Sequence, residues 1–342
     1  MKSKIIGIMA VKNAISQGYP FLEAVNSFLG FGDKLYIEDG NSTDGTFEIL
    51  KEISVNKKIK VFGGYDWSTT AKSGYAIGTA YNHVLKKVKD IYKNSHDTYL
   101  VEIQANEIFH ESIYKEIKEL LILYPQAIGY ILPYQIMVGN YLVYKEDWRL
   151  RIIKIDFDPI IYGDGAINLR KELSFNKFIY ALATASFRYI KLKSYYAQNL
   201  GRLAKFYHLV PLSKPVFRYT YIFPRNITNK TEGHARLYGN FKEYTSSDQK
   251  YIPAYIINHL SKKMLSNLKF YELLAKKLCV RGAVVTGLKP GPLTKLYTGA
   301  SIRTAVKPIF IPAKYHPKSM RNLLTRKQYT INRELVRKIK GL

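Results

Sequence analysis

"KLYIEDGNSTDGTFEIL", residues 34–50, decides how the first half of this chain is expected to fold. The segment begins apolar, becomes small, polar and acidic over residues 39–46, and then turns apolar again at helical spacing. This pattern predicts a short strand over residues 34–37, a polar corner, and a helix over residues 46–53. A strand-to-helix corner needs only a capping residue and a glycine, so a corner with two carboxylates and six further small residues indicates a bound ligand.

The same alternation of strand and helix patterns runs through the first hundred residues. Strands are predicted over residues 4–11, 34–37, 60–62 and 98–103, and helices over residues 19–29, 46–53 and 74–91. This order predicts an α/β fold, with a mostly parallel sheet and helices on both of its faces. Ligands of such sheets bind outside the carboxyl ends of the strands, here residues 10–13, 39–44, 63–67 and 104–107. We expect these four segments to lie side by side along one edge.

Length and composition bound the class of protein. The chain has 342 residues, 47% of them hydrophobic, which suits one large domain or two unequal ones. It has no run of about 18 apolar residues, so no membrane-spanning helix is predicted. Residues 2–12 could pass for a signal peptide, but their apolar part, residues 5–11, is short and runs directly into Lys12 and Asn13, so a buried strand is favoured. The single cysteine, Cys279, excludes a disulfide framework and a cysteine zinc site, and it fits a reducing cytoplasm.

The charge is strongly basic. The chain has 53 Lys and Arg against 26 Asp and Glu, a net charge of +27. Such a field attracts nucleic acid, anionic membrane surfaces or phosphorylated substrates. A solvated basic surface without any partner is the alternative.

Four segments resemble family 2 glycosyltransferases, in that family's order. Residues 39–46, DGNSTDGT, resemble its D-x-G-S-T-D-G-T signature. Lys12-Asn13 at the strand end VKN, residues 11–13, resembles its K-N-E, with Ala14 in place of the Glu. Trp67 followed by AYN, residues 80–82, resembles its W…A-R-N, and LVEIQANE, residues 100–107, stands where the family has a strand and D-A-D-E. The resemblance covers about residues 4–110 and implies a GT-A (Rossmann-like) fold that binds a nucleotide-diphospho-sugar.

The resemblance also implies which residues contact the donor. They are Ala10, Lys12, Asn13, Asp39, Gly40, Asn41, Asp44, Trp67, Asn82, Gln104, Asn106, Arg149 and Arg151. Asp39 can accept a hydrogen bond from an imide N–H of the base, and Asp39→Ala is expected to abolish donor binding with little loss of stability. The alternative for the two aspartates is structural. Asp39 would then form an Asx turn, and Asp44 or Thr43 would cap the following helix. The alternative for the two arginines is the solvent face of a strand.

The D-x-D segment departs from the family, because Gln104 and Asn106 replace its carboxylates. Those carboxylates normally hold a divalent cation that neutralises the diphosphate. Three alternatives stay open: Mn²⁺ or Mg²⁺ held by Asn106 and Glu107, neutralisation by Lys or Arg without a metal, and a degenerate, non-catalytic site. Strand alternation would place Glu102, Gln104 and Asn106 on one side and Glu107 on the other, unless the strand has already ended at that point.

An inverting transfer needs a base that deprotonates the acceptor. In this fold that carboxylate follows the D-x-D segment on a loop that faces the sugar. Asp164, between two glycines, is the first candidate and Asp147 the second; Glu146, Asp156 and Asp158 are further candidates. An ordinary turn aspartate is the alternative reading.

The whole chain is divided into two predicted domains. Residues 1–225 form the nucleotide-sugar-binding and catalytic domain, and residues 226–342 form a helical, basic C-terminal region that contacts the acceptor or an anionic membrane surface. Helices are predicted over residues 172–207, 255–278 and 321–340. His208 and His234 could complete a metal site or contact phosphate, and Arg218 and Lys230 are similar candidates; a structural role is the alternative for all four.

Three functions from different classes follow from these patterns. A glycosyltransferase, cytoplasmic and in peripheral contact with the membrane, explains the ordered strand-end motifs. A nucleic-acid-binding protein explains the charge and the aromatic residues but leaves the 39–46 corner unexplained, so no nucleic acid is expected as a partner. A catalytically inactive binding or scaffold protein explains the amides at positions 104 and 106.

Overall fold

The protein is represented by a computed structural model that describes residues 3–65, 75–93, 95, 97–125, 127–162, 166–169, 209–223, 226, 303–326 and 328–341. In this part of the chain, one large sheet has the strand order β3-β2-β1-β4-β7-β6-β11-β5, with β10 beside β6 and β12 beside β7. Its strands are β1 (Lys4–Val11), β2 (Lys34–Asp39), β3 (Ile59–Phe62), β4 (Thr98–Gln104), β5 (Glu107–Phe109), β6 (Gly129–Val138), β7 (Tyr141–Lys154), β10 (Leu209–Pro211), β11 (Val216–Tyr221) and β12 (Arg303–Phe310). A separate hairpin pairs β8 (Pro159–Tyr162) with β9 (Ala166–Leu169).

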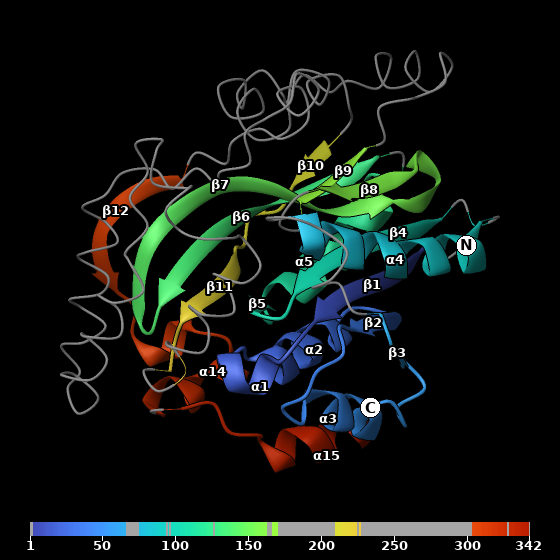
Figure 1. Cartoon of the computed structure of the whole chain (residues 1–342). Helices are drawn as coiled ribbons and strands as arrows, with labels where there is room; N and C mark the ends of the chain where they lie inside the picture. Colours follow the sequence, from blue (N-terminus) through green and yellow to red (C-terminus); the bar gives the residue numbers. More distant parts are fainter. Residues whose placement is uncertain are drawn as a thin grey trace, which may run out of the picture.

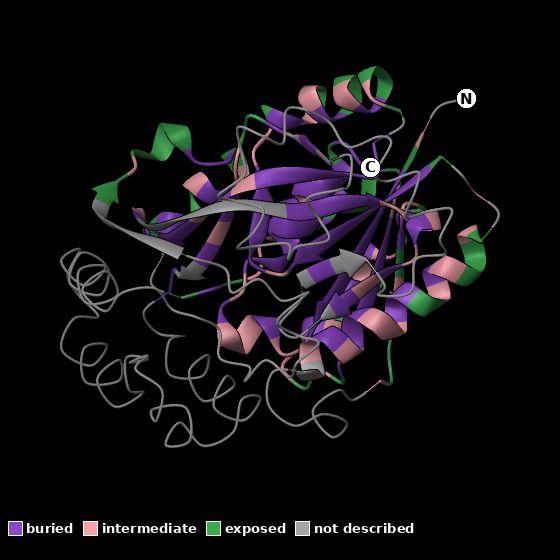
Figure 2. Cartoon of the chain, turned by 90° about the horizontal axis from the view of Figure 1, so that it is seen from above, coloured by how far each residue is buried: buried purple, intermediate pink, exposed green. Residues whose placement is uncertain are grey.

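The fold is of the expected α/β, Rossmann-like class, a mixed sheet of mostly parallel strands with helices. Strands β3, β2, β1 and β4 are parallel neighbours, and β10 and β11 run parallel to β6. The long, curved β7 is antiparallel to β4, β6 and β12 (Figure 1). Because helices cover both faces of the parallel strands, β1 is buried along almost its whole length (Figure 2).

Two separate hydrophobic cores lie on the two faces of the sheet. On one face, α2 (Phe21–Leu29), α3 (Thr46–Ile53) and α5 (Ile113–Leu123) contribute their apolar sides. On the other, α4 (Tyr75–Tyr92) packs Ala80, Val84 and Val88 against Ile6 and Ile8 of β1. The strands and helices predicted in the first hundred residues are confirmed to within two residues at each end. Pro20 is the N-cap of α2 rather than part of its first turn.

The end of the chain returns to the first core. Strand β12 pairs with β7, and α14 (Lys318–Arg321) and α15 (Arg333–Gly341) pack beside α2 and α3 (Figure 1). The helix predicted over residues 321–340 is wrong: a 3-10 turn, η5 (Leu323–Thr325), and non-helical residues separate α14 from α15. Within this non-helical segment, Tyr329 is buried against Phe21 and Phe223.

Two further predicted helices and the predicted domain boundary are not tested by the described residues. The helices predicted over residues 172–207 and 255–278 lie outside the described residues, and the domain boundary after residue 225 stays a prediction. Within the described part of the chain, none of the helices combines the length and the hydropathy needed to cross a bilayer.

Glu23 on α2 gives the first core a pH-sensitive group. Its side chain is fully buried, and Tyr329 Oη donates a hydrogen bond to Oε2 over 3.3 Å. Burial raises the pKa of Glu23 from 4.5 to about 7. The folded chain therefore keeps this proton up to about pH 7, whereas the unfolded chain releases it near pH 4.5.

The free energy of unfolding should consequently fall as the pH rises from 4.5 to 7, with a contribution from Glu23 of about 3 kcal/mol, and level off above that window. Glu23→Gln removes the titration and keeps the shape of the side chain. Urea unfolding of both proteins across this range should show the stability of Glu23→Gln relative to the parent rising by about 3 kcal/mol between pH 4.5 and pH 7. A difference that does not change with pH would contradict the burial argument.

Candidate functional site

The carboxyl ends of the parallel strands lie next to one another, as expected. The β1–β2 register pairs Val11 with Asp39, and the β1–β4 register pairs Ala10 with Gln104. On the outer side, Glu38 of β2 pairs with Phe62, the last residue of β3. Asp39, the end of β1 and Gln104 therefore follow one another along a single edge of the sheet.

Backbone and side-chain hydrogen bonds join the loops after β1 and β2 into one unit. The backbone N–H of Asn13 donates to Ser42 Oγ over 2.9 Å, and Asn13 Oδ1 accepts from the N–H of Thr43 over 2.8 Å. Asn13 and Asn41 have left-handed φ values of 50° and 57°, a conformation that asparagine tolerates better than most residues. The polar residues at this corner thus fix the shape of the edge.

Asp44 links α1 (Ala14–Gln17), the short helix after β1, to α3, the helix after β2. Its Oδ1 accepts from the N–H of Thr46 at 3.1 Å and from Thr46 Oγ1 at 2.6 Å, and its Oδ2 accepts from the N–H of Ser16 at 2.7 Å. Gly45, with φ at 89°, is the N-cap of α3, so neither Asp44 nor Thr43 holds the predicted cap position. These contacts support the structural alternative for Asp44, and its predicted contact with the donor stays a prediction.

Asp39 is buried beneath the same loop, with 1% of its surface exposed. Its Oδ2 accepts from the N–H of Ser42 at 2.9 Å, and its Oδ1 from Ser42 Oγ at 2.6 Å. Burial raises the pKa of Asp39, while the Ser42 hydrogen bonds and the charge of Lys12 act in the opposite direction. The Asx-type turn is therefore present, and each carboxylate oxygen keeps a second lone pair that a ligand N–H could use.

The turn after β4 places Glu102 and Glu107 around one arginine. Arg151 of β7 donates through Nη1 to Glu102 Oε2, and through Nη2 to Glu107 Oε1 over 2.7 Å. Tyr134 Oη also donates to Glu107 Oε1. The predicted alternation applies only while the strand continues, and β4 ends at Gln104; the turn at residues 105–106 brings Glu107 to the Glu102 side, where both bind Arg151.

The Gln104–Asn106 turn is held from two directions. The N–H of Gln104 lies 3.4 Å from Glu107 Oε2, and the carbonyl of Asn106 accepts from the N–H of Tyr219 on β11 at 2.9 Å. Both amide residues are largely buried, with exposures of 8% for Gln104 and 4% for Asn106. The turn is therefore a rigid part of the edge, and its geometry depends on Glu107.

A divalent cation fits these residues poorly. Glu107 is fully buried, Arg151 and Tyr134 both donate to its Oε1, and the charge of Arg151 opposes a cation placed beside the same carboxylate. Among the described residues, no group of three or more His, Cys, Asp or Glu is placed to hold a metal ion. The predicted Mn²⁺ or Mg²⁺ site at Asn106 and Glu107 stays a prediction.

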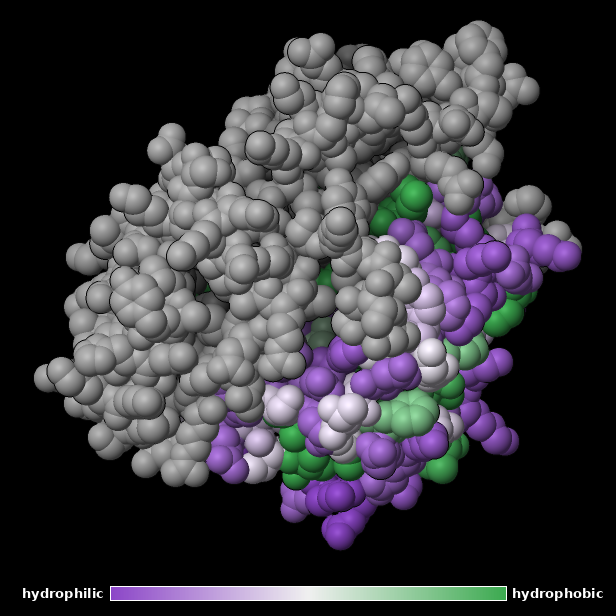
Figure 3. Space-filling model, viewed as in Figure 1, coloured by the Kyte–Doolittle hydropathy of each residue, from purple (hydrophilic) through white to green (hydrophobic). Residues whose placement is uncertain are grey.

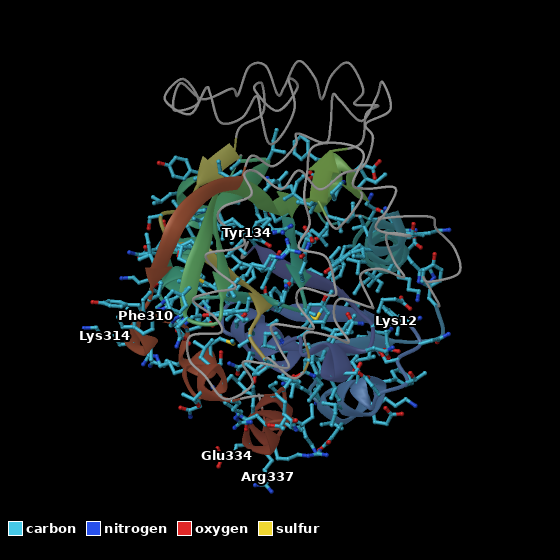
Figure 4. All side chains as sticks on the ribbon, turned by 60° about the vertical axis from the view of Figure 1, so that its left-hand side comes forward. Lys12, Tyr134, Phe310, Lys314, Glu334 and Arg337 are labelled. Carbon is cyan, nitrogen blue, oxygen red and sulfur yellow. The ribbon has the colours of Figure 1, made fainter. Side chains whose placement is uncertain are left out.

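Three other predicted donor contacts have defined places. Lys12 lies half-buried at the end of β1 (Figure 4). Asn82 of α4 exchanges hydrogen bonds of 2.7 and 2.9 Å with the backbone of Ile161, so its amide ties α4 to β8. Arg151 is 1% exposed; its contact with the donor stays a prediction, and it does not lie on the solvent face of its strand.

The remaining candidates are described in part or not at all. For Asp147 and Arg149 the structure describes the backbone only, within β7, where Arg149 pairs with Leu132. Trp67, Asp164, His208, Lys230 and His234 lie outside the described residues. Asp164 and Asp147 accordingly stay predictions as the catalytic base.

The structure adds a cluster that the sequence analysis missed, on the opposite face of β2 from Asp39. Glu38 is fully buried, and its Oε2 lies 3.0 Å from both His83 Nδ1 and Lys87 Nζ of α4. The ring of Tyr65 stacks on His83 with centroids 4.1 Å apart. The cluster fixes α4 to the end of β2. The signal in the sequence was a histidine and a lysine four residues apart, on one face of the predicted helix, together with a second carboxylate next to Asp39.

Solved structures similar to this chain share little sequence with it. S. aureus TarS 1-349 is 11% identical, with 81% of this chain and 82% of that chain covered and a TM-score of 0.38. The same protein in complex with UDP-GlcNAc is 10% identical, with 81% and 83% covered and a TM-score of 0.37. A putative glucose-1-phosphate thymidylyltransferase from Bacillus anthracis is 10% identical, with 48% and 68% covered and a TM-score of 0.27.

No family model matches the chain, and no curated protein matches it. At these identities and TM-scores, the similarities say nothing about what this chain binds or does.

Proposed function

We propose that this chain is a glycosyltransferase that moves a sugar from a nucleotide-diphospho-sugar to a glycan, lipid or protein acceptor, with inversion. The observation that carries the proposal is the register of the strand ends. It places the buried carboxylate of Asp39, the β1 end at Val11 and the amide of Gln104 along one edge of a parallel sheet. This is the edge at which such sheets bind ligands.

In the proposed complex, each part of the donor has a place along this edge. The base lies against Asp39, which accepts one of its N–H groups through a remaining lone pair. The rigid turn at Gln104 and Asn106 lies beneath the diphosphate and sugar. Asp164, or alternatively Asp147, takes the proton from the acceptor hydroxyl as its oxygen bonds to the anomeric carbon and the nucleoside diphosphate leaves.

The charge of the diphosphate must also be neutralised. Because Glu107 is engaged by Arg151, we favour basic side chains for this role, with Lys12 at the β1 end as the first candidate. Ligation of Mn²⁺ or Mg²⁺ by Asn106 and Glu107 is the competing proposal, and it requires the cation to share the buried carboxylate of Glu107 with Arg151.

A thermal-shift panel of UDP-, GDP- and dTDP-sugars tests the donor. Each donor is measured with and without Mn²⁺ or Mg²⁺, and a donor that binds should raise the unfolding midpoint by mass action. We expect a selective rise for one nucleotide that does not require a metal. A rise that appears only with a divalent cation would favour the competing metal site.

The amides at positions 104 and 106 favour one alternative, a catalytically inactive binding protein of the same fold. Nucleotide binding without hydrolysis or transfer of the sugar, measured for a range of acceptors, would support that function. A panel without any rise, together with salt-dependent binding of DNA, would instead support a basic nucleic-acid-binding protein.

A further inference from the structure

An apolar projection lies at the edge of the molecule, far along the chain from the strand-end site. We define the 309–315 turn as the end of β12 and the 3-10 turn η4 (Ala313–Tyr315). Three of its large side chains are about half exposed or more: Ile309 at 50%, Phe310 at 53% and Tyr315 at 57%. Figure 4 shows Phe310 and Lys314 projecting from the same side of the protein.

The base of this turn is held rigidly. His316 is fully buried; its Nε2–H donates to the carbonyl of Ile311 over 3.0 Å, so its Nδ1 accepts from Tyr219 Oη at 2.7 Å. Arg321 donates to the carbonyls of His316 and Lys314 over 3.1 and 2.9 Å. The exposed apolar side chains are therefore presented on a fixed base.

The turn lies within a strongly basic stretch. From residue 273 to residue 333 the sequence contains no Asp or Glu and 13 Lys or Arg. Within the turn, Lys314 Nζ lies 4.9 Å from the centroid of the Tyr315 ring. A carboxylate from another element, Glu111, accepts from the N–H of Lys318 at 2.8 Å. By contrast, much of the described surface seen in Figure 3, around α3 and α15, is hydrophilic.

We propose that the 309–315 turn docks the chain onto an anionic lipid bilayer. Exposed Phe, Tyr and Ile side chains among Lys and Arg suit shallow insertion into a headgroup region, because the apolar groups enter the interface while the cations meet lipid phosphates. A stable protein interface needs about 800 Å² from each partner, much more than three side chains offer. This inference does not depend on the proposed donor chemistry, so either can fail alone.

Vesicle flotation of the full chain tests the proposal. The chain should float with vesicles of equal parts phosphatidylcholine and phosphatidylglycerol, float poorly with phosphatidylcholine alone, and bind more weakly at high salt. Phe310→Ser/Tyr315→Ser should weaken partitioning about tenfold or more, because the apolar part of the binding is lost. Tryptophan emission of Phe310→Trp should shift to shorter wavelength, relative to the parent, only with the anionic vesicles.

The matched control is Ile122→Ser/Leu123→Ser, which removes two exposed apolar side chains at the end of α5, at 78% and 65% exposure. Phe310 is half exposed and its ring packs edge-on against Tyr141 with centroids 5.5 Å apart, so the unfolding midpoint of each variant is measured first, and flotation is compared between proteins that are folded at the assay temperature. Equal flotation of the parent and Phe310→Ser/Tyr315→Ser would overturn the proposal. An equal loss of flotation in Ile122→Ser/Leu123→Ser would also overturn it. The same holds if Phe310→Ser/Tyr315→Ser changes the chain from a dimer to a monomer but leaves lipid binding intact.

Discussion

Arg151→Met should lower the free energy of unfolding by about 3–5 kcal/mol, the cost of leaving buried carboxylates without their cation. Arg151 is 1% exposed and binds Glu102 and Glu107, both fully buried. Methionine fills a similar volume but supplies no charge and no donors. Urea unfolding, monitored by circular dichroism at neutral pH, measures the loss.

Two further variants show whether uncompensated charge is the cause. Lys154→Met changes a cation three residues along β7 whose Nζ lies 5.6 Å from the centroid of the Tyr99 ring, and it should cost much less. Adding Glu102→Gln and Glu107→Gln to Arg151→Met should recover part of the lost stability, because both uncompensated charges are removed. If the single variant loses less than about 1 kcal/mol, the cluster does not carry the stability assigned to a buried ion pair.

Asp39→Asn should weaken donor binding about tenfold to a hundredfold, the usual effect of losing a hydrogen bond to a charged group. The amide keeps the shape of the side chain but replaces one acceptor oxygen with a donor, which also opposes the N–H of Ser42. Isothermal titration with the donor selected by the thermal-shift panel measures the affinity. Unchanged donor affinity in a folded Asp39→Asn protein would remove the central claim of the proposed function.

Asp33→Asn is the matched control for Asp39. Asp33 lies just before the opposite end of β2, and its Oδ2 accepts from the N–H of Ile5 at 2.8 Å. Both variants should lose about 1–2 kcal/mol of stability, since each weakens a carboxylate hydrogen bond, but only Asp39→Asn should lose donor affinity. The expectation that Asp39→Ala costs little stability is thereby revised, because Asp39 is buried and accepts two hydrogen bonds from Ser42.

The strand-end edge could be predicted because each part of it is local. Apolar periodicity located β1, β2 and α3, and the alternation of strands with helices predicted parallel strands, whose carboxyl ends lie at one edge of the sheet. The Asx-type turn of Asp39 was also anticipated as an alternative, since Asp, Gly and Ser in sequence favour it. The same corner therefore serves the fold, whether or not it also binds a nucleotide.

The contacts around Glu107 could not be predicted by the same means. Counting alternate residues works only while a strand continues, and β4 ends at Gln104, which reverses the side on which Glu107 lies. Its partner Arg151 is 44 residues away and is brought there by the antiparallel pairing of β7 with β4 and β6. Neither the strand order nor the end of pairing is visible in a local window.

The sequence by itself therefore determined the α/β class, the order of the first strands and helices, and the polar residues at the strand ends, because periodicity and turn chemistry act over a few neighbouring residues. Only the tertiary structure decided that Arg151 is buried between two glutamates, that Glu38 holds α4 through His83 and Lys87, and that Tyr329 is buried in a non-helical segment between α14 and α15. Those outcomes depend on which distant side chains share a buried space, where an unpaired charge or an exposed ring would cost more than local preference can offset.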